Sequence, residues 1–549
     1  MSAASYDSEM TIVADLERAR QLSLAAKEEA AKDLLLSLVP AIEAADRDDW
    51  LLEVYAQLGE LYLVRTAYDG TDESVRRIRE CLATYQQVRA GNRPDLAEQV
   101  TMSDAEIDHM TCRYSRRAQF LQTGLAAAHG DHEAAEAALL VLTEDTTDHP
   151  DLADEHRRLI TFARILCANA LCEDDLHVQS VALWEKVIDA IEGTDGSDEF
   201  DDYLLVNGAT SYGRFCIETG RLPQAEPWLR RAGARAEARN WALGTARTQF
   251  ERATAAWALG DRAKAQDLAH ASYPAIAEGL RAHDVSRCWL YFGLISLSIH
   301  ELDDADERFG HAERHWREIE KPLHIHRILL QRSWVDIFRG DFDAARRRTE
   351  EARELLDSWP RHSWLQYARL HDHIGSIWRA DALADPDNAA AKLEKAAELK
   401  VPAALAVDSV RHLITDADAR MRWATHVSAR MLAGAFAVAW EWGNTDLVSQ
   451  LVEYHSARGT FSAEPDQEPT EWTGTATAAV PLETIDEYAL VAAGESLSVA
   501  GAGLTRLGPL PALQMDPTSG QILTRYRSLA RERYGRDVTA AGATWATWP

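Results

Sequence analysis

The sequence predicts an all-α protein whose helices form a solenoid of stacked hairpins. Four short segments align at a constant interval of 40 residues, and they begin at Gly220, Gly260, His300 and Gly340. Apolar residues on both sides of these segments recur at helical spacing, so that each helix has one apolar face. A hairpin of this kind cannot bury its apolar face alone, and neighbouring hairpins are therefore expected to stack.

One repeat unit, residues 289–312, shows how each hairpin is built. Its first helix places four apolar or small residues on one face, namely Trp289, Phe292, Gly293 and Ser296. The turn residue that follows is usually Gly, because a left-handed backbone conformation costs least in a residue without Cβ. The second helix carries Ala305, Phe309 and Ala312 at helical spacing. The small Ala305 beside the turn lets the two helices approach, and Phe309 fills the gap.

This residue order resembles that of a tetratricopeptide repeat (TPR), with its aromatic residue, its Leu-Gly or aromatic-Gly pair and its Ala-rich second helix. Two further stretches of the chain are similar to it, with Tyr212, Gly213, Gly220 and Ala225 in one and Tyr55, Leu58, Gly59 and Tyr62 in the other. The resemblance spans residues 50–455 and implies a right-handed α-solenoid. The period here is 40 residues, against about 34 in the family, which implies longer helices or longer loops.

Four parts are expected along the chain. Residues 1–49 are expected to be an N-terminal helical cap, and residues 50–458 the TPR-like repeat array. Residues 459–481 are rich in Thr, Ala, Glu and Pro without periodicity, which is typical of a linker. Residues 482–549 are expected to form a small irregular segment with a final helix over 522–534.

The charge of the chain disfavours two classes of partner. Its 549 residues include 58 Lys and Arg against 88 Asp and Glu, a formal net charge of −30. Nucleic acid is disfavoured because duplex affinity rests largely on cationic side chains, and an anionic membrane surface is disfavoured for the same reason. The longest apolar run, 431–440, is too short to span a bilayer. The N-terminus shows no secretory signal, so a cytoplasmic protein is expected.

The sequence lacks the short motifs of common catalytic and cofactor sites. No Gly is followed by Lys, which excludes a phosphate-binding loop, and neither the H-E-x-x-H nor the G-x-S-x-G motif occurs. The six cysteines are scattered, and the closest two, Cys167 and Cys172, lack the spacing of zinc ligands. They are expected to be buried, reduced thiols. We therefore expect no enzymatic activity, no cofactor and no metal site.

One set of residues repeats with the 40-residue period on the first helices. Arg247, Arg287 and Arg327 each lie 13 residues before a turn residue. The matching position faces the concave groove in TPR arrays, so the resemblance implies a ladder of arginines beside an apolar floor. The candidate peptide groove comprises Arg247, Phe250, Arg287, Leu290, Leu294, Arg327, Leu330 and Trp334. Their guanidinium groups suit peptide carboxylates, or they cover apolar surface and neutralise an acidic neighbouring helix.

A stacked array of hairpins without a catalytic signature is typical of a recognition surface. We therefore predict a scaffold or adaptor that binds another protein or an extended peptide. The alternative is a sensor of a small ligand or signalling peptide, whose array changes shape on binding.

The C-terminal residues carry a second resemblance. The stretch 507–515, followed by Tyr526, Arg533 and Tyr534, is similar to the ends of repeat proteins that accompany CHAT-type (caspase-like) proteases in actinobacteria. The hairpin at 439–457 looks alike too. The resemblance implies a CHAT-type protease as partner, in a bacterial conflict or stress-response system. Because the chain lacks the protease's α/β domain and Cys-His pair, it would be the partner of the protease.

If the arginine ladder binds carboxylates, Arg287→Glu should weaken partner binding strongly and leave the helicity unchanged, because it replaces attraction by repulsion at an exposed position. Circular dichroism and a binding titration of the same preparation measure the two effects. Unchanged affinity would assign the ladder to packing.

Overall fold

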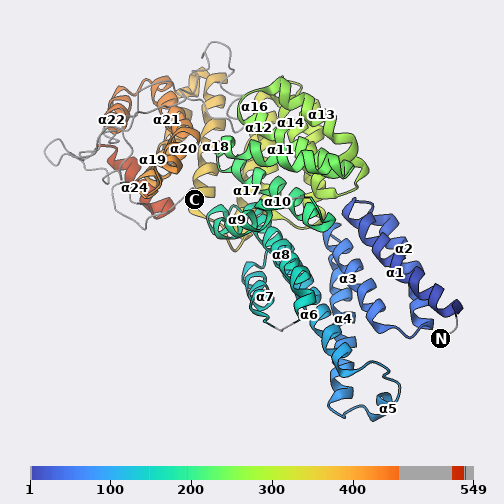
Figure 1. Cartoon of the computed structure of the whole chain (residues 1–549). Helices are drawn as coiled ribbons and strands as arrows, with labels where there is room; N and C mark the ends of the chain where they lie inside the picture. The colour runs from blue at the N-terminus through green and yellow to red at the C-terminus, as the bar shows by residue number, and fades with distance from the viewer. Residues whose placement is uncertain (1–2, 147–148, 195, 457–521, 537, 539–549) are drawn as a thin grey trace, which may run out of the picture. The chain divides into compact units, whose positions relative to one another are not determined.

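The computed structural model describes residues 3–146, 149–194, 196–456, 522–536 and 538, and they form an all-α solenoid of successive helical hairpins (Figure 1). The chain divides into two compact units. Unit 1 comprises Met1–Ala255 and Asp267–Val285, and unit 2 comprises Ala256–Gln266 and Ser286–Pro549. The predicted linker, 459–481, lies outside the described residues. None of the helices in the described part of the chain is long and apolar enough to cross a bilayer.

The helices follow one another with short connections. Unit 1 contains α1 (Ala3–Leu24), α2 (Glu28–Ala44), α3 (Asp48–Val64), α4 (Tyr68–Arg89), α5 (Pro94–Ala97), α6 (Asp104–Ala128), α7 (His132–Glu144), a 3₁₀ turn (Pro150–Leu152), α8 (Ala153–Glu173), α9 (His177–Glu192), α10 (Glu199–Glu218) and α11 (Leu222–Ala238). The division between the units passes through α12 (Ala242–Ala258), α13 (Arg262–Glu278) and α14 (Ala282–Ser298). Unit 2 continues with α15 (Leu302–Glu318), α16 (Pro322–Arg339), α17 (Phe342–Ser358), α18 (Trp364–Ala384), α19 (Ala389–Ser409), α20 (Ala417–Trp423), α21 (Ala429–Glu441), α22 (Thr445–Ser456) and α24 (Thr524–Tyr534).

The middle of the chain has a rhythm of 20 residues, half of the sequence period. From α11 to α17 every helix has 17 or 18 residues, and only two or three residues join each helix to the next. The repeat is therefore longer than that of the family because its helices are longer, and its connections are short.

Each connection in this region contains one residue with a left-handed backbone. These residues are Gly220, Asn240, Gly260, Leu280, His300, Glu320 and Gly340. The N–H of the next residue then bonds a carbonyl five residues back, as in the 2.9 Å bond from Asp341 N to Asp336 O. This Schellman arrangement satisfies carbonyls at the helix end and reverses the chain within three residues. In a residue with Cβ the left-handed conformation costs roughly 1–2 kcal/mol.

The buried faces of the hairpins carry the small residues that the pattern predicts. Ala225, Ala305 and Ala345, at the start of the second helices, are fully buried. On the first helices, Gly293 faces Phe309 so closely that a Cβ on Gly293 would lie 2.5 Å from the Phe309 ring. Helices α14 and α15 therefore approach each other as closely as they do because residue 293 has no side chain.

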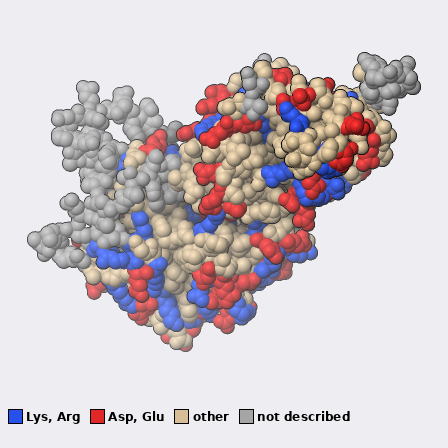
Figure 2. Space-filling view, turned by 90° about the horizontal axis from the view of Figure 1, so that it is seen from below, with Lys and Arg blue, Asp and Glu red and all other residues tan. Residues whose placement is uncertain are grey.

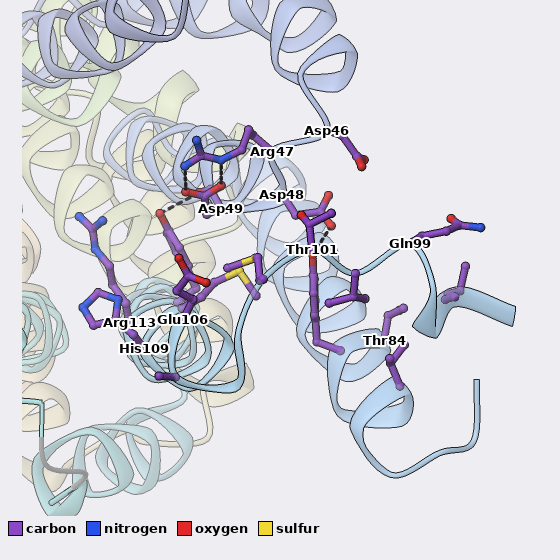
Figure 3. Close-up of a pocket in the computed structure, with 18 residues that line it drawn as sticks. Asp46, Arg47, Asp48, Asp49, Thr84, Gln99, Thr101, Glu106, His109 and Arg113 are labelled. Carbon is purple, nitrogen blue, oxygen red and sulfur yellow. Dashed lines mark hydrogen bonds and ion pairs between the residues drawn. The ribbon is translucent and has the colours of Figure 1, made fainter. Parts of the chain in front are cut away.

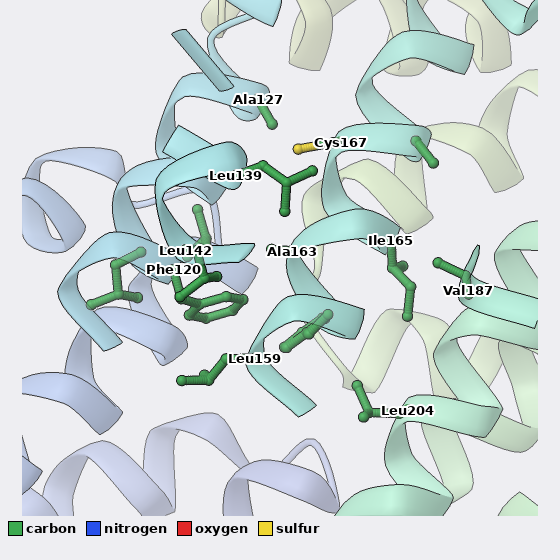
Figure 4. Close-up of a cluster of buried hydrophobic side chains, with 14 of the residues drawn as sticks. Phe120, Ala127, Leu139, Leu142, Leu159, Ala163, Ile165, Cys167, Val187 and Leu204 are labelled. Atoms are coloured by element: carbon green, nitrogen blue, oxygen red, sulfur yellow. The ribbon is translucent and has the colours of Figure 1, made fainter. Parts of the chain in front are cut away.

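Each unit has its own apolar core. The main core of unit 1 lies between α6 and α10 and is centred on residues such as Phe120, Leu139 and Ile165 (Figure 4). In unit 2, the final helix α24 packs on α18 and α19 and adds Tyr526 and Ala530 to the core. The segment expected to end in a helix over 522–534 thus ends in one that covers the face of its neighbours.

Two Gly→Ala substitutions in unit 2 test the close approach. Gly293→Ala should destabilise the protein by about 1–3 kcal/mol, because Phe309 has no room to move away. Gly310→Ala, on α15, should stabilise it by up to about 1 kcal/mol, because the nearest atom to the new Cβ is 3.9 Å away. The midpoints of thermal unfolding measure both. Equal shifts in the two variants would contradict the packing described here.

Candidate functional site

A cleft of about 700 Å³ opens in unit 1 between the start of α3, the end of α4 and the first half of α6 (Figure 3). It exists because the connection between α4 and α6 is long, covering residues 90–103 and including the single turn of α5. A three-residue turn would bring α4 and α6 into direct contact. The inserted residues instead hold them apart, and residues from 96 to 102 form one wall of the cleft.

The floor of the cleft is apolar. Tyr85 and Val88 of α4, Val100 of the connection, and the thioethers of Met102 and Met110 line it. Methionine side chains are flexible and polarizable, so they adapt to ligands of different shape. A volume of this size and an apolar floor are typical of a site that takes a small ligand or a few side chains of a partner.

The rim of the cleft is charged, with four carboxylates and two guanidinium groups. The carboxylates belong to Asp46, Asp48, Asp49 and Glu106, and the guanidinium groups to Arg47 and Arg113 (Figure 3). Arg47 forms two bonds to Asp49, of 2.8 and 2.6 Å, and its guanidinium group lies 3.8 Å from the centre of the Trp50 ring. Arg113 forms an ion pair of 2.9 Å with Glu155. Both cations already have carboxylate partners, which leaves the rim negative.

Two of the rim carboxylates are held in place by hydrogen bonds. Asp48 accepts a 2.7 Å bond from the Tyr85 hydroxyl, and burial together with this bond raises the pKa of Tyr85, so Tyr85 stays a donor. Glu106 accepts from the backbone and hydroxyl of Ser103 in a capping box at the start of α6. These bonds lower the pKa of Glu106.

Behind the cleft, a buried ionic network centred on Glu53 of α3 joins four helices. Arg117 of α6 donates to both carboxylate oxygens of Glu53 at 2.8 Å, and Arg20 of α1 donates at 2.7 Å. Glu53 is 6% exposed and Arg117 3%. Burial raises the pKa of Glu53, but the positive charges of Arg117, Arg20 and Arg113 outweigh it and hold that pKa well below its usual range. The cleft residue Tyr114 also donates to Glu53, at 3.2 Å.

The structure places the predicted groove residues at two depths. Phe250, Leu294 and Trp334 are buried in the array, so they pack between helices. The half-buried residues of the set are Arg247, Arg287, Leu290, Arg327 and Leu330. Peptide binding by this ladder stays a prediction.

The unit 1 end of the ladder contacts the chain itself. Arg247 donates to Asn207 at 3.1 Å and lies 3.3 Å from a carboxylate oxygen of Asp284. It also lines a cavity of only about 20 Å³ together with Leu24 and Ala26 of the α1–α2 turn. At Arg247, the face predicted to bind a peptide is thus covered by the N-terminal hairpin.

The sequence analysis did not identify the cleft. The available signals were the run of acidic residues at 46–49 and the interruption of the helical pattern between 90 and 103. Neither signal shows by itself that the two segments meet, because helices α3, α4 and α6 must first pack.

No protein-family model and no curated protein matches the chain. Among solved structures it is similar to the apo form of RapI, with 11% identity and a TM-score of 0.35 over 72% of this chain and 98% of that one. It is also similar to a circular tandem repeat protein with a novel repeat topology, with 13% identity and a TM-score of 0.16 over 83% of this chain and 96% of that one. Likenesses this distant carry no conclusion about function.

The Glu53 network makes a prediction about acid stability. Because the folded-state pKa of Glu53 is depressed, its contribution is present at neutral pH and is lost as the pH falls toward that pKa. Glu53→Gln should therefore lower the free energy of unfolding by about 3 kcal/mol at pH 7, by leaving buried arginine charge uncompensated, and should flatten its decline in acid. Urea unfolding at several pH values measures both effects.

The matched control is Glu73→Gln on the exposed surface of α4, where Glu73 pairs with Arg76 and Arg77. Water and salt screen that pair, so little change is expected. If the two variants behave alike, the Glu53 network does not stabilise unit 1.

Proposed function

We propose that the protein is a noncatalytic repeat scaffold that binds a partner protein in the unit 1 cleft, through a segment that presents a basic residue beside a flexible apolar one. The observation that carries this proposal is the combination of an apolar, methionine-containing floor with a rim on which carboxylates outnumber guanidinium groups.

The charges on the rim set the kind of segment. Arg47 and Arg113 are already neutralised by Asp49 and Glu155, so an incoming carboxylate would have to break an existing ion pair. An incoming Lys or Arg meets the carboxylates of Asp48 and Glu106, which both hold a fixed orientation. The cleft therefore favours a basic segment, whereas the arginine ladder was expected to favour an acidic one.

The same arrangement supports a binding role over a catalytic one. Catalytic acids and bases need a pKa near the working pH and access to a substrate. Glu53 is buried with a pKa far below neutral, and Tyr85 has a raised pKa and donates to Asp48. These groups suit the holding of charges in place.

The resemblance of the C-terminal residues supports a CHAT-type protease as one candidate partner, in a bacterial conflict or stress-response system. Of the residues that carry it, Tyr526 and Tyr534 are part of the apolar core of unit 2. They are therefore available to stabilise unit 2, which leaves the cleft as the better candidate for contact with the protease.

A second candidate function is that of a sensor of a small ligand or signalling peptide. The cleft volume of about 700 Å³ favours it, because such a volume matches a whole small ligand as well as it matches a few partner side chains. A ligand that is released when the purified protein is denatured, and that mass spectrometry identifies, would favour the sensor.

Two tryptophan substitutions on α4 test the scaffold. Val88→Trp fills the cleft and should reduce the partner recovered with tagged protein from its native host by about tenfold or more, the effect of losing roughly 1.4 kcal/mol. Gln87→Trp adds the same bulk at an exposed position of the same helix and should leave recovery unchanged. Quantitative mass spectrometry of the two eluates measures the difference.

Equal recovery of the same proteins by both variants would contradict binding in the cleft. Circular dichroism and melting of each variant confirm that neither substitution has unfolded unit 1, so that a loss of partner is not a loss of fold.

A further inference from the structure

Three donor atoms of different chemistry meet at the turn between α8 and α9. Cys172 lies in the last turn of α8, His177 begins α9, and Glu218 ends α10. The Cys172 sulfur, a ring nitrogen of His177 and a carboxylate oxygen of Glu218 lie within 4.8 Å of one another. The left-handed residue Asp175, with φ of 61°, turns the chain so sharply that the end of α8 lies beside the start of α9.

The two oxygens of Glu218 make different contacts. One accepts a 2.7 Å bond from Nε of Arg214, one turn earlier on α10, and the other lies 3.1 Å from Nε2 of His177. A cation between Cys172, His177 and the second oxygen would replace only the contact between His177 and Glu218. Arg214 would remain on the first oxygen and orient the carboxylate, as outer hydrogen bonds do at metal sites.

The surroundings of the sulfur are also suited to a thiolate. Ser180 Oγ lies 3.4 Å from the Cys172 sulfur and donates to the carbonyl of His177. The indole N–H of Trp184 is buried, with 1% of the residue exposed, and meets no acceptor at hydrogen-bonding geometry. Burial and the charge of Glu218 raise the pKa of the Cys172 thiol to about 12, and the approach of Ser180 and Trp184 opposes this rise. A thiolate bound to a metal would accept from the Trp184 N–H that now has no acceptor.

We propose that Cys172, His177 and Glu218 form a binding site for a zinc-like divalent cation, with three protein ligands and an open fourth position. Sulfur, imidazole nitrogen and carboxylate oxygen are the ligand atoms that Zn²⁺ takes in proteins. A thiolate and a carboxylate neutralise the two charges of the ion, which lowers the cost of partial burial. His177 and Glu218 are 14% and 29% exposed, so an ion can enter from solvent.

The site would tie two successive hairpins together. Cys172 and His177 belong to the hairpin of α8 and α9, and Glu218 belongs to the next hairpin. A bound ion would therefore stabilise their stacking within unit 1, independently of whether the cleft binds a partner.

Cobalt(II) is the probe, because a thiolate ligand gives it a strong charge-transfer absorption in the near ultraviolet. The full-length protein should show this band and saturate at one equivalent, and Zn²⁺ should displace it. Cys172→Ala should abolish the band. Cys167→Ala is the matched control, because Cys167 is a buried thiol on the same helix that faces the apolar core (Figure 4), and it should keep the band.

His177→Ala and Glu218→Gln should each weaken zinc affinity by about tenfold or more, measured by competition with a chromophoric chelator. Zinc should also raise the melting temperature of the wild-type protein and of Cys167→Ala, but not that of Cys172→Ala. Absence of the band in folded wild-type protein, or zinc affinity that is the same in Cys172→Ala and the wild type, would overturn the proposal.

Discussion

The structure depends on one backbone constraint, the left-handed residue that ends each helix. At Gly340 the conformation lets the next N–H reach back five residues, so a helix can end with its carbonyls satisfied and the next can begin almost at once. Short connections leave antiparallel neighbours no choice but to pack along their full length. Helices of 17 residues joined in this way generate the 20-residue rhythm, and the stacking of buried alanines and of Gly293 against Phe309 follows from it.

Function is expected where this rhythm is broken. Between α4 and α6 the chain takes residues 90–103 instead of a tight turn, and the space that opens is the cleft. The insertion alone would leave two helices free to move. The Glu53 network prevents this by joining α1, α3 and α6 through buried ion pairs with Arg20 and Arg117, so that the cleft has rigid walls and a flexible methionine floor.

The sequence predicts the hairpins well because their small residues and turn glycines recur at a fixed interval. It does not reveal the 20-residue rhythm, because alternate left-handed positions hold residues such as Leu280 and Glu320, which give no local signal. Contacts between distant segments are hidden for a stronger reason. Glu218 lies far along the chain from Cys172 and His177, and only the packing of α10 on α8 and α9 brings the three together. The predicted absence of a metal site rested on local cysteine spacing, which cannot report such a meeting.

The distribution of charge links the sequence to the proposed partner. Acidic and basic side chains are interspersed over the visible face of the molecule (Figure 2), although the chain carries a net charge of −30. Many of its arginines are engaged within the fold, as Arg117 is by Glu53 and Arg47 by Asp49. Each cation used in this way is one fewer to balance carboxylates elsewhere, so the excess of negative charge remains at positions such as the cleft rim. A chain that uses its own cations to hold its helices together is complementary to a partner that brings its own.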